Sequence, residues 1–560
     1  MEGNGLYDAS DPKGKFTFAI FKHQQIDVIT SGNHELYLQN TSKREYGEMV
    51  PDYKNSYIAS NLDIRDSKAK NDEGEWTAMA PRYRILTTKN LKLRVLAFGF
   101  VYDFHGTAPN TRVQDVEETI KEQWFQDAIR EKNIDLFLIA GHVPVRASKE
   151  YDALYKAIRK EIWDTPIVFF GGHTHIRDFK KWESNAMGIE SGRYMETLGF
   201  LSIDGLGSHS AKGKGDVAVK KSPKYQRLYI DNNLFSLHHH SGTDNSTFPT
   251  ELGQNVSSMI HDARKNLTLD HIFGCAPHDF WLNRAPFPSE GSILTLLGDK
   301  ILADTFNARK DPAIIVTNSG AIRFDIFNGP FTIDTTFLVS PFTSGFRMIK
   351  NVDTKLAARV ISILNNEGPI PLKDLSALAG DSDKFGDYRL HDLMAPSPPV
   401  NNPTLNARHA PAQSPLRPST EDPQVPGYTT TDDLGNSGDD TIHQPIKFYE
   451  VPNCIATNIH IDPGDKETAP EKVDLVYNEF IQDWVLLALR YLGVTYGEEN
   501  TRMELEGRSM TEVISGWVGE HWGCGGDGGG KADKVLGDEE EDEEGDAGVG
   551  EATAGFHHDL

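Results

Sequence analysis

The chain has 560 residues, of which 38% are hydrophobic and 10% aromatic, so it is too long for one hydrophobic core. Its formal net charge of −25 at pH 7 argues against nucleic-acid or anionic-membrane partners, because phosphate contacts need clustered lysine and arginine. No apolar run reaches the length of a membrane-spanning helix. We therefore expect two folded domains with additional segments.

The first half of the chain alternates apolar strands with amphipathic helices. The predicted elements are a helix leading into a strand over 13–30, a strand at 93–100, a helix at 112–132, a strand from Leu136, a helix at 149–163, a strand from Ile167 and a strand at 225–231. This alternation predicts an α/β sandwich with parallel connections over residues 1–240.

The second half predicts another α/β domain over 281–522, joined to the first by a linker region at 241–280. Its expected elements are a helix at 289–308, a strand at 313–316, and helices at 352–365 and 471–493. The Pro- and Ser-rich residues 394–426 indicate a flexible insertion. The Gly-rich, acidic residues 523–560 indicate a disordered tail.

Three apolar runs in the first domain each end in a glycine followed closely by a histidine. The turns are Gly32-Asn33-His34-Glu35, Gly141-His142 and Gly171-Gly172-His173-Thr174-His175. Ligands of open α/β sheets bind at the carboxyl ends of strands, so three such turns are expected to converge. Imidazole nitrogens and an asparagine oxygen at one point favour a first-row transition metal.

Each residue also has a structural interpretation. Asn33 is compatible with a helix cap, and His34 and His142 with turn residues, since a lone histidine is more often hydrogen-bonded in a core or on a surface. The doublet His173 and His175 gains weight because alternate residues of an extended chain point the same way. Three such turns in order favour a catalytic metal cluster.

At these residues the chain resembles the calcineurin-like metallophosphoesterases. That family orders its motifs as Asp-x-His, Gly-Asp-x-x-(Asp/Glu), Gly-Asn-His-(Asp/Glu), a Gly-His turn and Gly-His-x-His, and the chain matches the last three. Further on, Thr317-Asn318-Ser319-Gly320-Ala321-Ile322-Arg323 and Ser340-Pro341-Phe342 resemble the C-terminal domain of 5′-nucleotidases. The likeness is greatest to the fungal, vacuolar-type branch with both domains.

The resemblance implies a phosphoester hydrolase with nucleotides as the expected substrate and with two divalent ions of zinc, manganese or iron type. By motif position, Asn33, His142 and His173 would hold one ion and His175 the other. His34 would act as the general acid that protonates the leaving oxygen. An aspartate three residues after this histidine is expected to orient it, and the chain has Tyr37 there.

The same resemblance implies that the second domain binds the nucleotide. Asn318 would hydrogen-bond the base, Arg323 would hold ribose or phosphate oxygens, and Phe342 would stack on a base. Phe342 follows a proline and is equally compatible with a place in the core. A small-molecule phosphoester or nucleotide is thus the expected partner.

The chain opens within the family's second motif, with Glu2 at its final acidic position. The Asp-x-His turn and the Gly-Asp carboxylate shared by both metals are missing, and a truncated gene model or an alternative start is the expected cause. Metal occupancy and activity of this form are expected to be low, because no anionic ligand remains. The alternative is a non-catalytic nucleotide- or protein-binding relic.

The cysteines and the asparagines of glycosylation sequons give information about the cellular compartment of the protein. Cys275, Cys454 and Cys524 are odd in number without metal spacing, so buried or idle thiols are expected. The chain has four Asn-x-Ser/Thr sequons, at Asn40, Asn245, Asn255 and Asn266. These and the family resemblance suggest a vacuolar or secreted protein, or a cytoplasmic one if Met1 is the true start, because the chain opens without a signal peptide.

Overall fold

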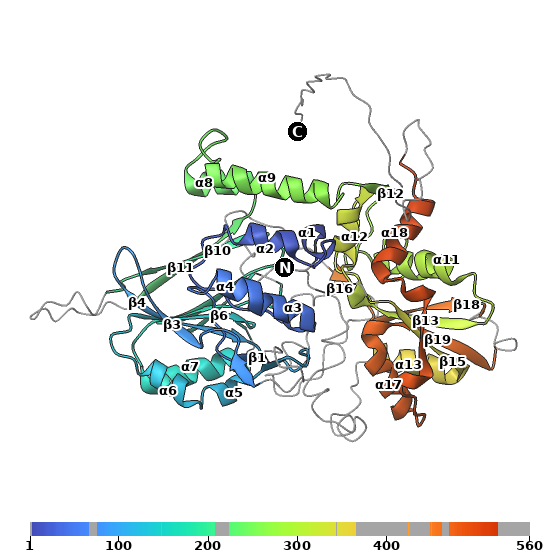
Figure 1. Cartoon of the computed structure of the whole chain (residues 1–560), viewed down its shortest axis with the longest axis horizontal. Coiled ribbons are helices and arrows are strands. Elements are labelled where there is room, and N and C mark those ends of the chain that lie inside the picture. Colours follow the sequence, from blue (N-terminus) through green and yellow to red (C-terminus); the bar gives the residue numbers. More distant parts are fainter. Residues whose placement is uncertain are drawn as a thin grey trace, which may run out of the picture. The chain divides into compact units, whose positions relative to one another are not determined.

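The computed structural model describes most of the chain as far as Cys524 (Figure 1). The described residues are 3–65, 75–146, 148–175, 177–207, 223–342, 344–365, 424–425, 448–449, 451–461 and 470–524. The predicted acidic tail after Cys524 and nearly all of the predicted insertion at 394–426 lie outside the described residues.

A six-stranded sheet organises the first half (Figure 1). Its strands in spatial order are β3 (Tyr83–Thr87), β4 (Arg94–Val101), β6 (Leu136–His142), β7 (Ile167–Phe170), β9 (Ala186–Ser191) and β8 (Arg177–Glu183). The central strands β4, β6, β7 and β9 are parallel, and the two edge strands are antiparallel to their neighbours. The mixed sheet and its long apolar central strands confirm the predicted α/β class.

The predicted helix at 149–163 is confirmed as α7 (Lys149–Glu161), which buries Tyr151, Leu154 and Ile158 against the sheet. The predicted strand at 225–231 is confirmed as β11 (Lys224–Asp231), which pairs with β10 (Thr197–Asp204). Apolar spacing therefore located these elements within a residue or two.

The single helix predicted at 112–132 is wrong. The segment forms β5 (Thr111–Val113), α5 (Val116–Thr119) and α6 (Gln123–Ile129). The side-chain amide of Gln126 donates to the carbonyl of Ile120 at 2.7 Å, where a continuing helix would place a backbone N–H. The Gln126 side chain thus takes the carbonyl of Ile120 as its acceptor at the point where the helix is interrupted.

The strand predicted at 26–30 is also wrong, although the helix before it is present as α2 (Lys15–Phe21). Ile29 alone bridges to Tyr57, through backbone bonds to Ser56 and Ile58 of 3.0 and 2.9 Å. The run is half-buried rather than enclosed in a sheet. Its apolar content therefore reflects packing on one side only.

A five-stranded sheet organises the second half, in the order β18 (Cys454–Ile459), β13 (Ala313–Asn318), β19 (Lys472–Asn478), β15 (Phe346–Asp353) and β20 (Thr501–Glu504). Alternate residues of β13 enter two separate cores, Ile315 on one face and Ile314 and Val316 on the other. Helices α13 (Thr354–Asn365) and α17 (Gln482–Tyr491) cover the second face, and α18 (Met510–His521) the first. Both sheet faces are thus buried.

The helix predicted at 471–493 is wrong for its first half, which forms the central strand β19 before α17. Val473 to Tyr477 are buried on both faces of the sheet. The apolar residues of this short run therefore show no periodicity from which a strand could be distinguished from a helix. The predicted helix at 289–308 is confirmed over Ile293–Phe306, as α10 (Ile293–Leu296), a π-helical turn and α11 (Ala303–Phe306).

The region predicted as a linker contains ordered structure. Helix α8 (Leu234–Ser241) is followed by α9 (Glu251–Asn266) and by β12 (Ile272–Ala276), which pairs with β14 (Gly329–Thr332). Helix α9 packs against α1 (Gly5–Asp8) and α2, through partly buried side chains on one face.

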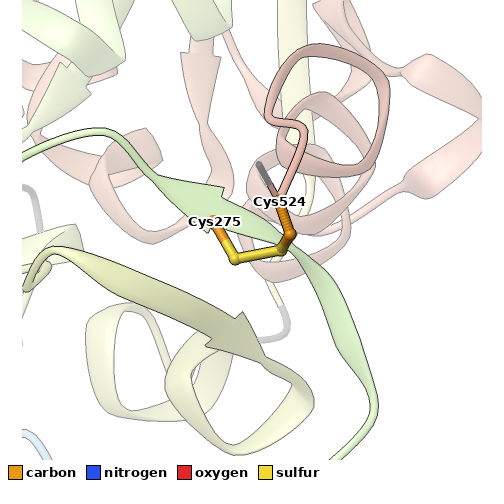
Figure 2. The surroundings of a disulfide bond; sticks show 2 residues. All are labelled: Cys275 and Cys524. Atoms are coloured by element: carbon orange, nitrogen blue, oxygen red, sulfur yellow. A yellow bond between two sulfur atoms is a disulfide. The ribbon is translucent and has the colours of Figure 1, made fainter. Parts of the chain in front are cut away.

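A disulfide joins Cys275 on β12 to Cys524 after α18, with the Cα atoms 4.8 Å apart and a sequence separation of 249 (Figure 2). The expectation of idle thiols is therefore wrong for these two residues, because sequence spacing does not show which cysteines meet in space. It is confirmed for Cys454, whose thiol is free and buried.

Candidate active site

Two of the three predicted ligand turns begin where strands of the first sheet end, and the turn at Gly32 follows the isolated bridge at Ile29. His142 is the last residue of β6, and His173 and His175 follow β7. Gly171 allows this loop to pass close to its neighbour, since a Cβ there would lie 2.6 Å from the carbonyl oxygen of Val143. His173 and His175 have φ values of +82° and +63°, a left-handed backbone that is strained for histidine and typical of functional sites.

The three turns meet at one place. The Nε2 atom of His142 lies 3.2 Å from the Nδ1 atom of His173. A Cβ on Gly32 would lie 3.2 Å from both the Nδ1 atom of His142 and an Oε2 atom of Glu35, so the first turn lies directly beside the second. The ring of Tyr102 stacks on His173 with the centroids 4.3 Å apart, which fixes the imidazole plane.

Asn33 has the environment of a ligand rather than of a cap. Its side chain makes no capping hydrogen bond, and its amide nitrogen donates to the Tyr37 hydroxyl at 2.8 Å. The Oδ1 atom is buried and has no hydrogen-bond partner among the described residues. A buried amide oxygen without a donor is energetically costly, and a cation would satisfy it.

Tyr37 therefore supports Asn33, where the family pattern leads us to expect an acidic partner for His34. Its ring meets His34 edge to face at 5.2 Å and Phe104 at 5.4 Å. Glu35, the residue after His34, accepts a hydrogen bond from the backbone N–H of Gly32 at 3.0 Å.

Burial keeps His142, His173 and His175 neutral near pH 7. It lowers the pKa of His142 to about 4, with a smaller effect of His34, and that of His175 to about 3, with Arg323 adding to the effect. Burial followed by the His142 ring holds the pKa of His173 well below its ordinary value. Neutral imidazoles keep the lone pair that a metal requires.

Burial alone would raise the pKa of the Glu35 carboxyl. The positive charge of the chain's amino terminus, followed by the His34 and His142 rings and the Gly32 N–H bond, outweighs burial and lowers this pKa to about 2. Glu35 is therefore ionised, and it brings a negative charge into the first of the three turns.

The donor set fits a divalent cation in chemical type but is poor in charge. It comprises one amide oxygen and three imidazoles, and among the described residues no group of three or more His, Cys, Asp or Glu side chains is arranged to hold a metal ion. Asparagine oxygen with imidazole suits zinc- or manganese-type ions. Charge compensation would have to come from outside these four side chains.

Glu190 is a functional candidate that the sequence did not reveal. It lies on β9 and is 1% exposed, and burial raises the pKa of its carboxyl well above the ordinary value. Its oxygens accept hydrogen bonds from the Thr174 hydroxyl and, at 3.2 Å, from the Val145 backbone N–H. Glu190 thus ties the loop after β6 to the loop after β7, and no local motif marks it.

In the second half, Asn318 and Asn478 end the parallel neighbours β13 and β19. The amide nitrogen of Asn478 donates to the Oδ1 atom of Asn318 at 2.7 Å, and both residues are buried. The pair therefore occupies the carboxyl edge of the sheet, where ligands of α/β folds bind.

Arg323 connects the two candidate sites. Its NH2 atom lies 3.5 Å from the Nε2 atom of His34, and its guanidinium carbon lies 5.5 Å from the centre of the Phe342 ring. The structure thus brings the predicted general acid, the predicted substrate arginine and the predicted stacking ring into one neighbourhood.

Phe342 is partly exposed, which argues against the core alternative. Its ring faces that of Phe480, with centroids 6.4 Å apart and an interplanar angle of 29°. Phe480 is 49% exposed, unusually so for a large apolar side chain beside a buried strand end. The sequence offered only one signal for Phe480, its position three residues after Tyr477, where an apolar run ends.

Comparison with known proteins agrees with this organisation. Residues 6–177 match the family of calcineurin-like phosphoesterases, and residues 279–486 match the C-terminal domain of NAD nucleotidase. The chain is 33% identical to an uncharacterised protein of Schizosaccharomyces pombe over 93% of this chain and 79% of the relative. It is 32% identical to a protein of Arthroderma benhamiae named as secreted, over 88% and 78% of the two chains.

Among solved structures, the 5′-nucleotidase of Candida albicans is similar to the whole described fold. It superposes with a TM-score of 0.75 at 32% identity and covers 93% of this chain and 87% of that chain. The resemblance predicted from the motifs is therefore confirmed for both halves. The chain belongs to the calcineurin-like phosphoesterases that carry a 5′-nucleotidase-type C-terminal domain.

Proposed function

We propose that this protein is a metal-dependent hydrolase that releases phosphate from nucleotides. The observation that supports it best is the 3.5 Å approach of Arg323 to His34, because it joins a nucleotide-type pocket to the metal-type turns. A phosphoester placed between these groups would have its nucleoside toward Phe342 and its phosphate toward His142 and His173.

The residues have distinct roles in this proposal. Asn33, His142 and His173 would hold one divalent ion and His175 a second. Such ions, when bound, polarise phosphoryl oxygens and lower the pKa of water. His34 would hold a proton for the leaving ribose oxygen, and Arg323 would neutralise phosphate charge through its planar fork.

The nucleoside would be recognised at the carboxyl edge of the second sheet. The ring centroids of Phe342 and Phe480 are 6.4 Å apart, and a base stacked between two rings needs roughly 7 Å. An outward movement of the exposed Phe480 ring would therefore admit a base. The Asn318 amide lies at the same edge and offers hydrogen bonds to the base. Stacking with few hydrogen bonds would give affinity for nucleosides with modest discrimination among bases.

One observation favours a second candidate function, nucleotide binding without turnover. The predicted ligands of this chain include no carboxylate, and neutral donors bind divalent ions weakly. We therefore infer slow turnover by the chain as it stands.

Two measurements distinguish these functions. Calorimetric titration with Mn²⁺ and Zn²⁺ is compared between the native chain, His173→Ala and a control, His239→Ala, whose exposed ring lies on α8. Phosphate release from AMP and from an aryl phosphate is measured with the same proteins. Metal-dependent release that His173→Ala abolishes supports the hydrolase. Adenosine binding without any release would leave the binding function instead.

We also infer a secreted or vacuolar location. The Cys275–Cys524 disulfide requires an oxidising compartment, and a relative 32% identical to this chain is named as secreted. Among the described residues no helix is long and apolar enough to cross a membrane. Fractionation of cells with an antibody against the chain tests this location.

A further inference from the structure

Three of the four sequons lie in the stretch of sequence that connects the strands of the first sheet to those of the second. Asn245 lies in the turn between α8 and α9, Asn255 lies in the second turn of α9, and Asn266 is its last residue. All three asparagines are exposed, as are the acceptor hydroxyl residues Thr247, Ser257 and Thr268.

Helix geometry places two of these asparagines on one flank. Asn255 and Asn266 are eleven residues apart, and at about 100° per residue they differ by only about 20° around the axis of α9. Of the residues that α9 buries or half-buries, Val256, Ile260 and Ala263 lie about 60–140° further round the helix, and Met259 lies beside the asparagines at the edge of the packed face. Both asparagine side chains are nevertheless exposed. A large group on the asparagine flank would therefore not displace the packing of α9 against α1 and α2.

Asn245 is presented differently but is equally accessible. The Oδ1 atom of Asp244 accepts hydrogen bonds from the backbone N–H groups of Ser246 and Thr247, at 2.9 Å each, and from both hydroxyls. This turn projects the intervening asparagine outward at a loop tip.

The disulfide supplies the second, independent observation. Closing Cys275 to Cys524 removes two protons and two electrons from two thiols, and a disulfide-carrying oxidant of the secretory pathway accepts them. The compartment that forms this bond is also the one that attaches N-linked oligosaccharides.

We propose that Asn245, Asn255 and Asn266 are N-glycosylation sites, which makes this region a glycan-bearing face of the protein. In the transfer, each Asn Nδ2 atom forms a bond to C1 of a lipid-pyrophosphate-linked oligosaccharide. The bond from C1 to the pyrophosphate oxygen breaks, the amide loses one proton, and lipid pyrophosphate leaves.

The fourth sequon differs in a testable way. Asn40 is exposed on α3 (Gln39–Arg44), but its acceptor Ser42 is fully buried and bonds to Leu38, Gln39 and Asn110. Attachment there must precede folding, so Asn40 is expected to carry less glycan than the other three sites.

A glycan face would also mask apolar surface. Leu234 and Phe235 on α8 are 60% and 76% exposed, and Leu252 on α9 is 46% exposed. Exposed apolar groups of this size in a secreted protein favour association between chains. Bulky, hydrated glycans nearby would oppose that association.

The test uses the full chain isolated from its own cells without reducing agent. An N-glycanase digest in ¹⁸O water converts each glycosylated asparagine to a mass-labelled aspartate, which peptide mapping locates. We expect label at Asn245, Asn255 and Asn266, and stepwise loss of gel mass in Asn245→Gln, Asn255→Gln and Asn266→Gln. Asn307→Gln, at an exposed asparagine outside any sequon, should leave the mass unchanged.

Two outcomes would overturn the proposal. One is unlabelled asparagine at all three sites in protein whose Cys275–Cys524 bond has formed. The other is reduced Cys275 and Cys524 together with unlabelled sites, which would place folding outside the secretory pathway. Neither result depends on hydrolase activity. Ser257→Ala and Thr268→Ala, which keep the asparagines but remove the acceptors, should each abolish one label.

Discussion

Thr174 lies in sequence between His173 and His175, which we assign to metal binding, and its hydroxyl donates a hydrogen bond to the buried carboxyl of Glu190. The other oxygen of Glu190 accepts the backbone N–H of Val145, three residues after His142. One side chain thus positions two ligand loops from underneath. A carboxyl at 1% exposure is costly to bury, which is consistent with a positioning role rather than a packing role.

Replacing Glu190 should separate these roles. Glu190→Leu removes both acceptors and should weaken Mn²⁺ or Zn²⁺ binding at least tenfold, since unpaired buried donors cost about 1–3 kcal/mol and release the loops. Glu190→Gln can still pair with Thr174 and Val145 and should remain within about threefold of the native affinity. Calorimetric metal titration measures both, with the melting temperature recorded in parallel. Equal metal affinities for the two variants would refute positioning by Glu190.

Asn33 offers a test of the charge deficit at the site. Asn33→Asp places a carboxylate where a buried amide oxygen has no partner, and it should tighten divalent binding about tenfold or more through added Coulomb attraction. Asn33→Leu should weaken binding, because it removes the oxygen. Asn307→Asp, which adds the same charge at an exposed site, is the matched control. A rise in affinity with Asn307→Asp as well would point to general electrostatics instead.

Phe480 should govern affinity for nucleosides without affecting phosphate chemistry. Phe480→Ala removes one face of the stacked pair and should weaken adenosine binding roughly tenfold, as expected for a stacking energy of about 1–3 kcal/mol. Hydrolysis of an aryl phosphate should change little. Phe235→Ala, at an exposed phenylalanine on α8, serves as control. Unchanged adenosine affinity in Phe480→Ala would remove this residue from the pocket.

Glu45 predicts a pH-dependent stability. It lies 4% exposed under the first turn, where it accepts the Tyr57 hydroxyl at 2.6 Å, and Tyr57 in turn bonds to Ser31. Burial, followed by the negative charge of Glu35, raises the pKa of Glu45 to about 7. A raised carboxyl pKa favours the folded state when the group is protonated.

The stabilisation from Glu45 is therefore fully present below about pH 4.5 and is lost as pH rises through about 7, by up to roughly 3 kcal/mol. Urea unfolding at several pH values measures this slope, and Glu45→Gln should flatten it. Other titrating groups contribute to the absolute curve, so the difference between native and variant slopes is decisive. Parallel curves for the two proteins would contradict the prediction.

Hydrophobic periodicity predicted several strands and helices of the first half, and the order of the motifs predicted which residues form the candidate site. The strands β4, β6 and β7 were found because they are apolar, and glycines mark the ends of β6 and β7. The convergence of His142 and His173 followed from their place at these strand ends, whereas the turn at Gly32 reaches the same place without a strand before it. The β19 strand was misassigned because buried residues on both faces leave no period to read. The predicted strand at 26–30 failed because apolar content does not report hydrogen-bond partners.

The sequence could not predict residues whose roles depend on partners far away along the chain. Glu190 and Phe480 gain their meaning from partners that only the fold brings near, Thr174 and Val145 in one case and Phe342 in the other. The pairing of Cys275 with Cys524 is of the same kind, since the two cysteines have a sequence separation of 249.

That pairing has a consequence for proteolysis. A protease that cuts the chain anywhere between Cys275 and Cys524 would yield two pieces still covalently attached, so the nicked molecule would migrate as one species until a reductant separates it. The second sheet, whose strands all lie within this span, would keep its fragments together after backbone scission. In a protease-rich setting such as a lytic organelle, the bond would preserve the assembled domain rather than merely raise its melting point.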